Sequence, residues 1–282
     1  MYKEFYGFTK KPFSKTPDPE FLYLSKSHQE SLSRLQYAVE EKELMLLTGE
    51  IGSGKTTLSR ALLDQLDESY KIIMITNPVL SPSQFLRLIA KGLGIDLIKH
   101  FRVDVLEQIN LKLYSMYEED ISPVVIIDEA QLIPSRETFE EIRLLTNFQL
   151  DDENLITIIL IAQPEIIKRL KHKVYEPLTQ RIGLRFHLSA LTYGEMMEYV
   201  HFRMETAGVG KKIFSEDALK KIFEYSKGIP RVANNIAASS LLSGFGKGVK
   251  IIDSDIVYDI ASELQLVEPD LSRNDRKIYL KK

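Results

Sequence analysis

The sequence predicts an α/β fold, in which a five-stranded parallel sheet flanked by helices is followed by an all-α domain. Between residues 44 and 190, apolar runs rich in Ile, Val and Leu alternate with helical patterns. Continuous apolar strands separated by helices are typical of a parallel sheet that is buried on both faces. After residue 190 the strand signals stop and only helical patterns follow, which indicates a separate helical domain.

The first 43 residues are expected to form a loop and then a helix that leads into the sheet domain. Three prolines lie within residues 11–23 and exclude a regular helix there. The sequence SHQE that follows indicates a capping box, with Ser27 as the N-cap and Glu30 reaching back to it.

From residue 44 onward, strands and helices are expected to alternate. The five strand candidates are residues 44–48, 71–76, 124–128, 155–162 and 184–188. The helical patterns between and after them lie near residues 55–67, 82–93, 103–118, 136–148 and 164–171. Together these elements predict a domain over residues 44–190.

Four further helices are expected in the second domain, over residues 191–265. They are predicted at residues 193–207, 216–227, 231–245 and 254–264. Thr192, Ser215 and Asp253 are suitable N-cap residues for three of them. Residues 266–282 are polar and lack periodicity, so we expect a mobile C-terminal tail.

Composition excludes several classes of protein. The longest apolar run, residues 155–162, is too short to span a bilayer, and the start of the chain lacks the apolar core of a signal peptide. No cysteine is present, so disulfides and thiolate metal sites are excluded. A net charge of −3 argues against a generally basic nucleic-acid-binding surface but leaves a local basic patch open. We therefore expect a soluble, cytoplasmic protein.

The segment GEIGSGKTTL (49–58) carries the strongest signal in the sequence. It stands between the first strand and the next helix and matches the phosphate-loop pattern G-x-x-x-x-G-K-(S/T). Glycine lets a polyphosphate approach the backbone, and the N–H groups at a helix start favour anions. Lys55 is expected to supply positive charge to the β and γ phosphates, and Thr56 to ligate magnesium. The predicted ATP-binding residues of this loop are Gly49, Gly52, Gly54, Lys55, Thr56 and Thr57.

The run VVIIDEAQ (124–131) supplies a second half of the site. It ends in two carboxylates, which should stand at the carboxyl edge of the sheet beside the phosphate loop. Asp128 is suited to hold magnesium through water. Glu129 is suited to orient the attacking water, because phosphoryl transfer depends on positioning more than on covalent chemistry.

Three further side chains are candidates for sensing the γ-phosphate. Gln163 ends the fourth strand and could bond that phosphate or the water, although a simple turn before Pro164 is the alternative. Arg181 could reach the nucleotide of a neighbouring subunit as an arginine finger, with Arg185 as a second candidate and surface salt bridges as the alternative. Arg231, in the first turn of a helix in GIPRVANN, would contact the γ-phosphate of its own subunit, because a cation there needs an anionic partner.

These motifs together resemble the AAA+ superfamily, and the N-terminal part of the chain resembles the ExeA/GspA-like secretion ATPases. The resemblance runs from residue 1 to about residue 264 and includes AQPE, LTQRI and GIPRVANN. It implies a P-loop ATPase with a helical lid that uses ATP and magnesium, forms a homo-oligomer (a ring or a filament), and acts in type II secretion or envelope assembly. Family members of that type usually continue into a membrane span and a peptidoglycan-binding module, so this sequence is expected to be either an ATPase portion or a short soluble member.

The cellular role stays open at this point among three classes. One is an assembly ATPase with a protein partner in secretion. Another is a DNA-binding regulator of transposition, because short members of similar appearance accompany transposases. The cations of KRLKHK (168–173), with Arg273, Arg276, Lys277, Lys281 and Lys282 in the tail, could neutralise phosphates, although such runs are usually solvated helix faces. The third is a nucleotide-gated adaptor that hardly hydrolyses ATP.

Overall fold

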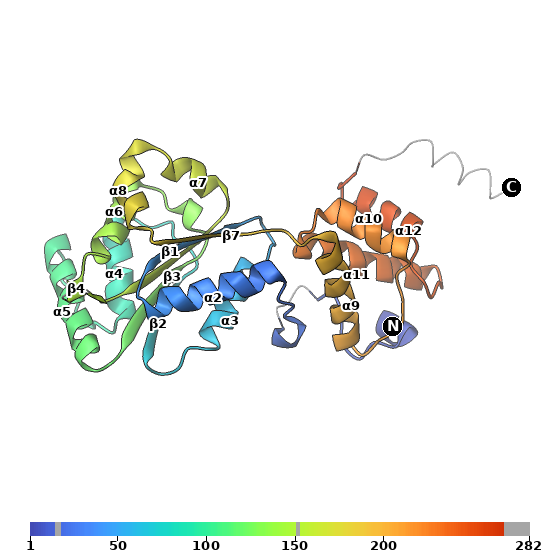
Figure 1. The fold of residues 1–282 in the computed structure, drawn as a ribbon, viewed down its shortest axis with the longest axis horizontal. Helices are drawn as coiled ribbons and strands as arrows, with labels where there is room; N and C mark the ends of the chain where they lie inside the picture. The colour runs from blue at the N-terminus through green and yellow to red at the C-terminus, as the bar shows by residue number, and fades with distance from the viewer. Residues whose placement is uncertain (15–17, 151–152, 268–282) are drawn as a thin grey trace. The chain divides into compact units, whose positions relative to one another are not determined.

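The computed structural model describes residues 1–14, 18–150 and 153–267, which form two compact units (Figure 1). One unit consists of residues 24–189. The other combines residues 1–23 with the chain from Ala190 onward. The expectations about the basic tail from Arg273 to Lys282 lie outside the described residues.

The unit of residues 24–189 is built on a five-stranded sheet in the order β2-β3-β6-β1-β7, and every neighbouring pair is parallel. The expected strands are confirmed, with bounds shifted by up to two residues. They are β1 (Leu44–Gly49), β2 (Tyr70–Ile75), β3 (Ser122–Ile127), β6 (Thr157–Ala162) and β7 (Leu184–Leu188). The α/β fold class is therefore confirmed.

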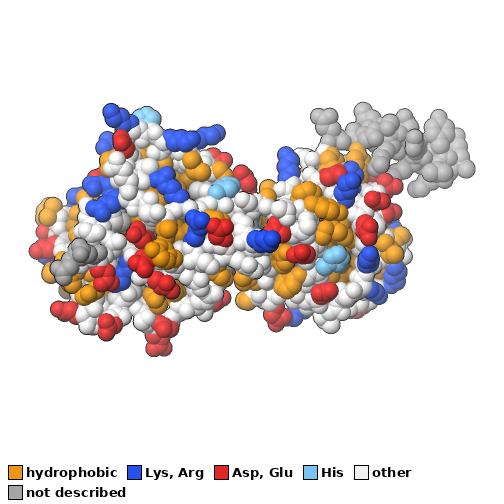
Figure 2. Space-filling view, in the orientation of Figure 1, with side chains coloured by type: hydrophobic (Ala, Val, Ile, Leu, Met, Phe, Trp, Pro, Cys, Tyr) orange, Lys and Arg blue, Asp and Glu red, His pale blue; other side chains and the backbone are white. Residues whose placement is uncertain are grey.

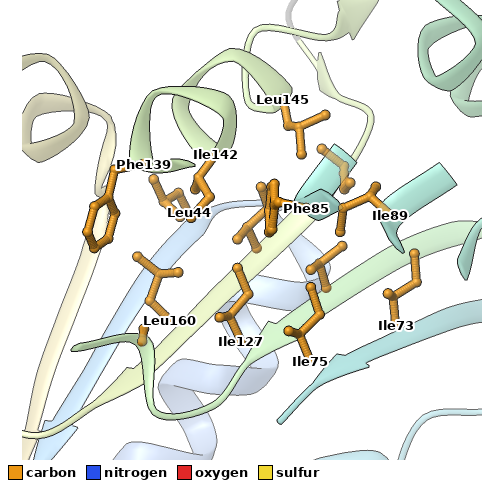
Figure 3. Packing of buried hydrophobic residues seen from close by; sticks show 14 of the residues in the cluster. Leu44, Ile73, Ile75, Phe85, Ile89, Ile127, Phe139, Ile142, Leu145 and Leu160 are labelled. Carbon is orange, nitrogen blue, oxygen red and sulfur yellow. The ribbon is translucent and has the colours of Figure 1, made fainter. Parts of the chain in front are cut away.

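Strands β1, β3 and β6 are buried on both faces, because successive side chains of a strand point to opposite faces and both faces of the sheet are covered by helices. On one face, Ile73, Ile75 and Ile127 pack with Phe85 and with other apolar side chains of the covering helices (Figure 3). Those helices are α4 (Pro82–Gly92), α5 (Arg102–Glu118), α6 (Arg136–Leu145), α7 (Glu165–Leu170) and α8 (Glu176–Arg181). The other face is covered by α2 (Lys26–Glu40) and α3 (Lys55–Leu63) (Figure 1).

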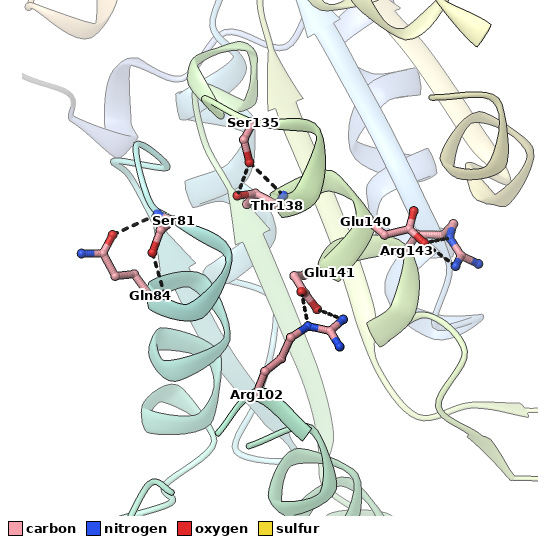
Figure 4. Close-up of polar contacts among 8 residues, drawn as sticks. All are labelled: Ser81, Gln84, Arg102, Ser135, Thr138, Glu140, Glu141 and Arg143. Atoms are coloured by element: carbon pink, nitrogen blue, oxygen red, sulfur yellow. Dashed lines mark hydrogen bonds and ion pairs between the residues drawn. The ribbon is translucent and has the colours of Figure 1, made fainter. Parts of the chain in front are cut away.

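Polar side chains fix the ends and the mutual placement of the helices on the first face (Figure 4). Ser81 and Gln84 form a capping box at the start of α4. Arg102, the first residue of α5, donates two hydrogen bonds to the carboxylate of Glu141 in α6, at 2.6 and 2.9 Å. The side chain of Glu141 is only 4% exposed, so this ion pair neutralises a buried charge between two helices.

Several small elements of the α/β unit were not predicted from the sequence. Strands β4 (Gln149–Leu150) and β5 (Glu153–Asn154) form a short antiparallel pair, and α8 follows a 3-10 turn over Lys173–Tyr175. Each of these elements is only a few residues long. The hydrophobic periodicity that indicates a strand or a helix needs a longer window than they offer.

The second unit contains four helices that confirm the pattern expected after residue 190. They are α9 (Tyr193–Thr206), α10 (Glu216–Ser226), α11 (Pro230–Gly246) and α12 (Ser254–Glu263). Thr192, Ser215 and Asp253 each accept a hydrogen bond from the backbone N–H three residues later, so the expected N-caps are confirmed.

The N-terminal segment belongs to this helical unit, whereas the expected division grouped residues 1–43 as a lead into the sheet domain. Residues 2–6 form a short helix, α1 (Tyr2–Tyr6), and the aromatic rings of Phe13 and Phe21 enter the helical core. Arg203 of α9 is 8% exposed, donates to the Pro12 carbonyl oxygen at 2.6 Å and stacks over Phe21. Long-range aromatic and cation–π contacts of this kind leave no periodic trace in the sequence.

The expected start of helix α2 at Ser27 is wrong. Ser25 is the N-cap, because its side chain accepts the N–H of His28 and its own backbone is extended. Ser27 lies within the first turn instead, and its hydroxyl accepts the backbone N–H of Ser189 at 3.3 Å.

Candidate functional site

The residues predicted to bind phosphate and magnesium, to orient water and to sense the γ-phosphate from the α/β unit gather at the carboxyl edge of the sheet, whereas Arg181 and Arg185 do not. The phosphate loop follows β1, the two carboxylates follow β3, and Gln163 follows β6. Strand β6 pairs with both β1 and β3, so the ends of all three strands are neighbours. This topology brings side chains together that are up to 114 positions apart in the sequence, from Gly49 to Gln163.

Two glycines of the loop are required by its geometry. Gly54 has φ +109°, a left-handed conformation that disfavours other residues, and a Cβ there would lie 2.8 Å from Nε2 of His28. A Cβ at Gly49 would lie 2.9 Å from the backbone oxygen of Leu188 in β7. Gly52 also has positive φ, at 83°. The loop therefore turns tightly against β7 and α2.

The loop ends in the first turn of α3, which begins at Lys55 with Gly54 as its N-cap. Thr56 and Thr57 are exposed in this turn, whose backbone N–H groups have no partner within the helix. The buried Lys55 ammonium donates to the carbonyl oxygens of Gly49 and Glu50 at 2.6 and 3.0 Å. A lysine ammonium and the helix N–H groups of the first turn thus lie in one short loop-to-helix segment, and these are the groups that an anion site requires.

Asp128 joins the loop to strand β3. The Thr56 hydroxyl donates to Asp128 Oδ2 at 3.2 Å, and the backbone N–H of Glu129 donates to Asp128 Oδ1 at 2.9 Å. The two residues predicted as magnesium ligands are therefore in direct contact. A hydroxyl and a carboxylate are hard oxygen donors of the type that Mg²⁺ binds, so the residues present fit this ion.

Glu129 is held by two amides. Nε2 of Gln131 and Nε2 of Gln163 both donate to Glu129 Oε2, at 2.5 and 3.0 Å. The Oε1 atom of Gln131 in turn accepts the backbone N–H of Gln163 at 3.0 Å. Glu129 itself has a left-handed backbone, with φ 53° and ψ 38°. A conformation that is unusual outside glycine and a double hydrogen bond together fix the direction of this carboxylate.

Two residues of the site were missed in the sequence. Gln131 follows the carboxylates by only two or three positions, and its link to Gln163 depends on the pairing of β3 with β6. His28 comes from helix α2, and its Nε2 lies 3.0 Å from the backbone oxygen of Ser53 in the loop. His28 stands within the SHQE segment of the expected capping box, but nothing in the sequence indicates that its side chain contacts the loop.

The candidate arginine fingers lie away from the phosphate loop of their own unit. Arg181 ends α8, and the backbone N–H of Gly183, two residues on, donates to Leu44 at the start of β1. The loop follows the other end of β1, five residues on, or about 16 Å at ~3.3 Å per residue. Arg181 is exposed and donates to Asn147 Oδ1 at 2.6 Å, while Arg185 donates to the Thr179 carbonyl at 2.6 Å.

Arg231 is the second residue of α11 in the helical unit. It is exposed, and within the described part of the chain it forms no ion pair. Pro230 precedes it at the first helical position, where a proline is well tolerated.

The run KRLKHK separates into two groups. Arg169 is structural, because it donates to Tyr175 Oη at 3.0 Å and stacks on the rings of Phe139 and Tyr175. Figure 2 shows Lys and Arg side chains gathered over the end of the unit where Figure 1 places α7 and α8. In this run, Lys168, Lys171 and Lys173 are exposed, and none has an ion-pair partner among the described residues.

Among the described residues, no helix combines the length and the apolar character that crossing a membrane requires.

Sequence comparisons show that the chain is similar to a general secretion pathway protein and contains a match to the AAA domain family. The AAA domain family matches residues 38–170. Over 260 residues, or 91% of this chain, the sequence is 38% identical to general secretion pathway protein A of Aeromonas hydrophila. The chain covers 47% of that relative, and so spans about half of its length.

Solved structures with the same fold include ORC proteins. The ORC2 protein of Aeropyrum pernix, in ADPNP–ADP complexes, matches with a TM-score of 0.62 and 20% identity, over 91% of this chain and 72% of that one. Drosophila ORC bound to DNA matches with a TM-score of 0.66 and 15% identity, over 93% of this chain and 65% of that one. At these identities the likeness concerns the fold, which is that of AAA+ P-loop proteins.

Proposed function

Because the chain is an ExeA/GspA-like AAA+ protein, we propose that it binds ATP with magnesium and hydrolyses it to ADP and phosphate. One observation carries the proposal. Lys55, the contact between Thr56 and Asp128, and the clamped carboxylate of Glu129 lie together at one edge of the sheet. This set contains a cation for the phosphates, oxygen ligands for a metal and an oriented acceptor for water.

In this proposal the loop binds the triphosphate through backbone N–H groups and Lys55. The six loop residues from Gly49 to Thr57 that were predicted for ATP binding would line this cradle. Thr56 and Asp128 would hold magnesium, Asp128 through water. When bound, the ion neutralises charge on the phosphate oxygens.

Glu129 would orient the attacking water, and Gln163 would sense the γ-phosphate beside it. The water oxygen bonds to the γ-phosphorus, a proton of that water passes to the Glu129 carboxylate and then to solvent, and the bond to the β–γ bridging oxygen breaks so that ADP leaves. Because Gln131 and Gln163 hold one carboxylate oxygen, the other oxygen is directed by the same clamp. The hydrogen bond between Gln163 and Glu129 also links the candidate sensor to the water-orienting residue.

Full activity would require a second subunit. Arg181 lies at the amino end of β7, about 16 Å along the sheet from its own loop, so it could complete only a neighbour's site. Its partner Asn147 is neutral, which leaves the charge of the guanidinium uncompensated by that contact. Subunits would associate through the end of the sheet that carries Arg181. Contact of Arg231 with the γ-phosphate would move the helical unit, and the two effects would link ATP binding and hydrolysis to action on a partner.

The partner is proposed to be a protein of secretion, as the name of the Aeromonas relative suggests, or of envelope assembly, as the family resemblance implies. A test of the ATPase is the rate of phosphate release measured across protein concentration, with Lys55→Ala as the inactive control. Specific activity that rises until the oligomer saturates would support an ATPase with shared sites. ATP binding without turnover at any concentration would favour the nucleotide-gated adaptor instead.

A second candidate function is DNA-dependent regulation, and the exposed Lys168, Lys171 and Lys173 favour it. Three lysines without ion-pair partners among the described residues could neutralise phosphates of a duplex. Binding of the full chain to DNA should then require ATP, weaken steeply with salt and be lost in a triple Lys→Gln variant. Salt-independent or absent binding would remove this candidate.

A further inference from the structure

His28 connects helix α2 to the phosphate loop through a buried side chain that is 5% exposed. Its Nε2 lies 3.0 Å from the Ser53 carbonyl oxygen, and its Nδ1 lies 2.7 Å from Ser25 Oγ. A carbonyl oxygen only accepts, so Nε2 must carry a proton. In the neutral ring Nδ1 then accepts the proton of the Ser25 hydroxyl, which fixes both the tautomer and the ring orientation.

The contact to Ser53 determines which way the next N–H points. In a planar trans peptide the C=O and N–H groups point in opposite directions. The Ser53 carbonyl is turned toward His28, so the N–H of Gly54 is turned away from His28. Gly54, at φ +109°, has little steric resistance to rotation of this peptide. A bond from outside the loop is therefore needed to hold it.

The fit between His28 and the loop also depends on Gly54. A Cβ at this position would lie 2.8 Å from His28 Nε2, closer than real side chains approach. Only glycine at position 54 leaves room for the His28 ring. The hydrogen bond from the ring in turn restricts the peptide that glycine leaves free to rotate.

We propose that His28 is a positioning residue of the nucleotide site, which holds the Ser53–Gly54 peptide so that the Gly54 N–H is presented to a phosphate oxygen. The inference rests on the proposed function, because it assigns a phosphate to the loop. Successive backbone N–H groups in such a turn form an anion-binding concavity, and each must already point inward before the anion arrives. His28 supplies that pre-organisation from helix α2.

The test compares three variants of the full chain. His28→Leu removes the donor and keeps an apolar side chain of moderate size. His28→Gln retains an N–H donor at a similar distance from the backbone. Ser25→Gly removes the partner of Nδ1 while retaining a residue that is tolerated at an N-cap. Calorimetric titration with MgADP and with Mg²⁺ plus a non-hydrolysable ATP analogue measures Kd, and hydrogen exchange measures the amides of residues 49–58 in the ligand-free protein.

We expect Kd for both nucleotides to rise roughly tenfold or more in His28→Leu, since one hydrogen bond to a charged group corresponds to about 10- to 100-fold. In His28→Gln it should stay within about threefold of the wild type, and in Ser25→Gly it should rise by an intermediate factor. Amide exchange in residues 49–58 should accelerate most in His28→Leu, less in Ser25→Gly and least in His28→Gln. A merely structural role would lower the melting temperature and leave both patterns unchanged.

Two results would overturn the proposal: a His28→Leu protein that binds as tightly as the wild type, or a His28→Gln protein as weak as His28→Leu. If His28→Leu does not fold, an unchanged Kd in Ser25→Gly overturns it equally. Failure of the proposed nucleotide binding is distinguishable, because wild-type protein would then bind neither nucleotide. A wild-type protein that binds nucleotide without hydrolysing it leaves the Kd comparison valid. The exchange measurement needs no ligand and in that case decides alone whether His28 holds the loop.

Discussion

Glu129→Gln should abolish ATP turnover and spare ATP binding. The amide is isosteric with the carboxylate, so its oxygen can occupy the position of Oε2 and accept both bonds, which measure 2.5 Å from Gln131 and 3.0 Å from Gln163. Its NH₂ group then takes the place of Oε1. The atom proposed to orient the water changes from an acceptor to a donor, while the surrounding clamp stays intact.

The expected loss follows from that single change. Positioned acid–base groups contribute roughly 10²- to 10⁴-fold to the rate. At ~1.36 kcal/mol per tenfold, this corresponds to about 2.7–5.4 kcal/mol of transition-state stabilisation. Binding should change by less than about twofold, because the predicted phosphate and metal contacts are made by Lys55, Thr56 and Asp128, whose hydrogen bonds the variant leaves in place.

Single-turnover phosphate release and nucleotide titration measure the two quantities separately. Glu165→Gln is the matched control, since Glu165 is an exposed glutamate in the first turn of α7, two residues after Gln163. The control should hydrolyse ATP at the wild-type rate. Turnover by Glu129→Gln within twofold of wild type would refute the assignment of Glu129, and a parallel loss of binding would refute the separation of roles.

Three further predictions concern assembly, the helical unit and its pH dependence. Arg181→Ala and Lys55→Ala should each be nearly inactive, and mixing them should restore some activity through interfaces that pair an intact loop with an intact arginine; a mixture as inactive as its parts would exclude the trans arrangement. Arg231→Ala should reduce the protection from proteolysis that ATP gives the helical unit, and equal protection in both proteins would remove its role as a sensor. Burial and the hydrogen bond from Tyr23 Oη to Glu198 Oε2 raise the pKa of Tyr23, so its stabilising contribution is full below the ordinary tyrosine pKa and is lost as pH rises above about 10. Tyr23→Phe should therefore show a smaller fall in melting temperature between pH 9 and 11 than the wild type, and identical falls would contradict this.

The sequence by itself determined the features that depend on neighbours along the chain. The five strands follow from continuous apolar runs, and Thr192, Ser215 and Asp253 follow from cap preferences that act over three or four residues. The phosphate loop follows from a fixed spacing of glycines and a lysine between a strand and a helix. In each case the stabilising interaction lies within a window that the sequence displays directly.

The tertiary structure decided what depends on contacts between distant segments. The sheet order puts Gln163 beside Glu129, and it places Arg181 at the opposite end of β1 from the loop. His28 reaches Ser53 across 25 positions, and Arg203 draws Pro12 into the helical unit across 191. Hydrogen bonds and stacking contacts between single side chains leave neither a hydrophobic period nor a fixed spacing in the sequence. Which partners meet is settled only when the sheet and the helices have packed.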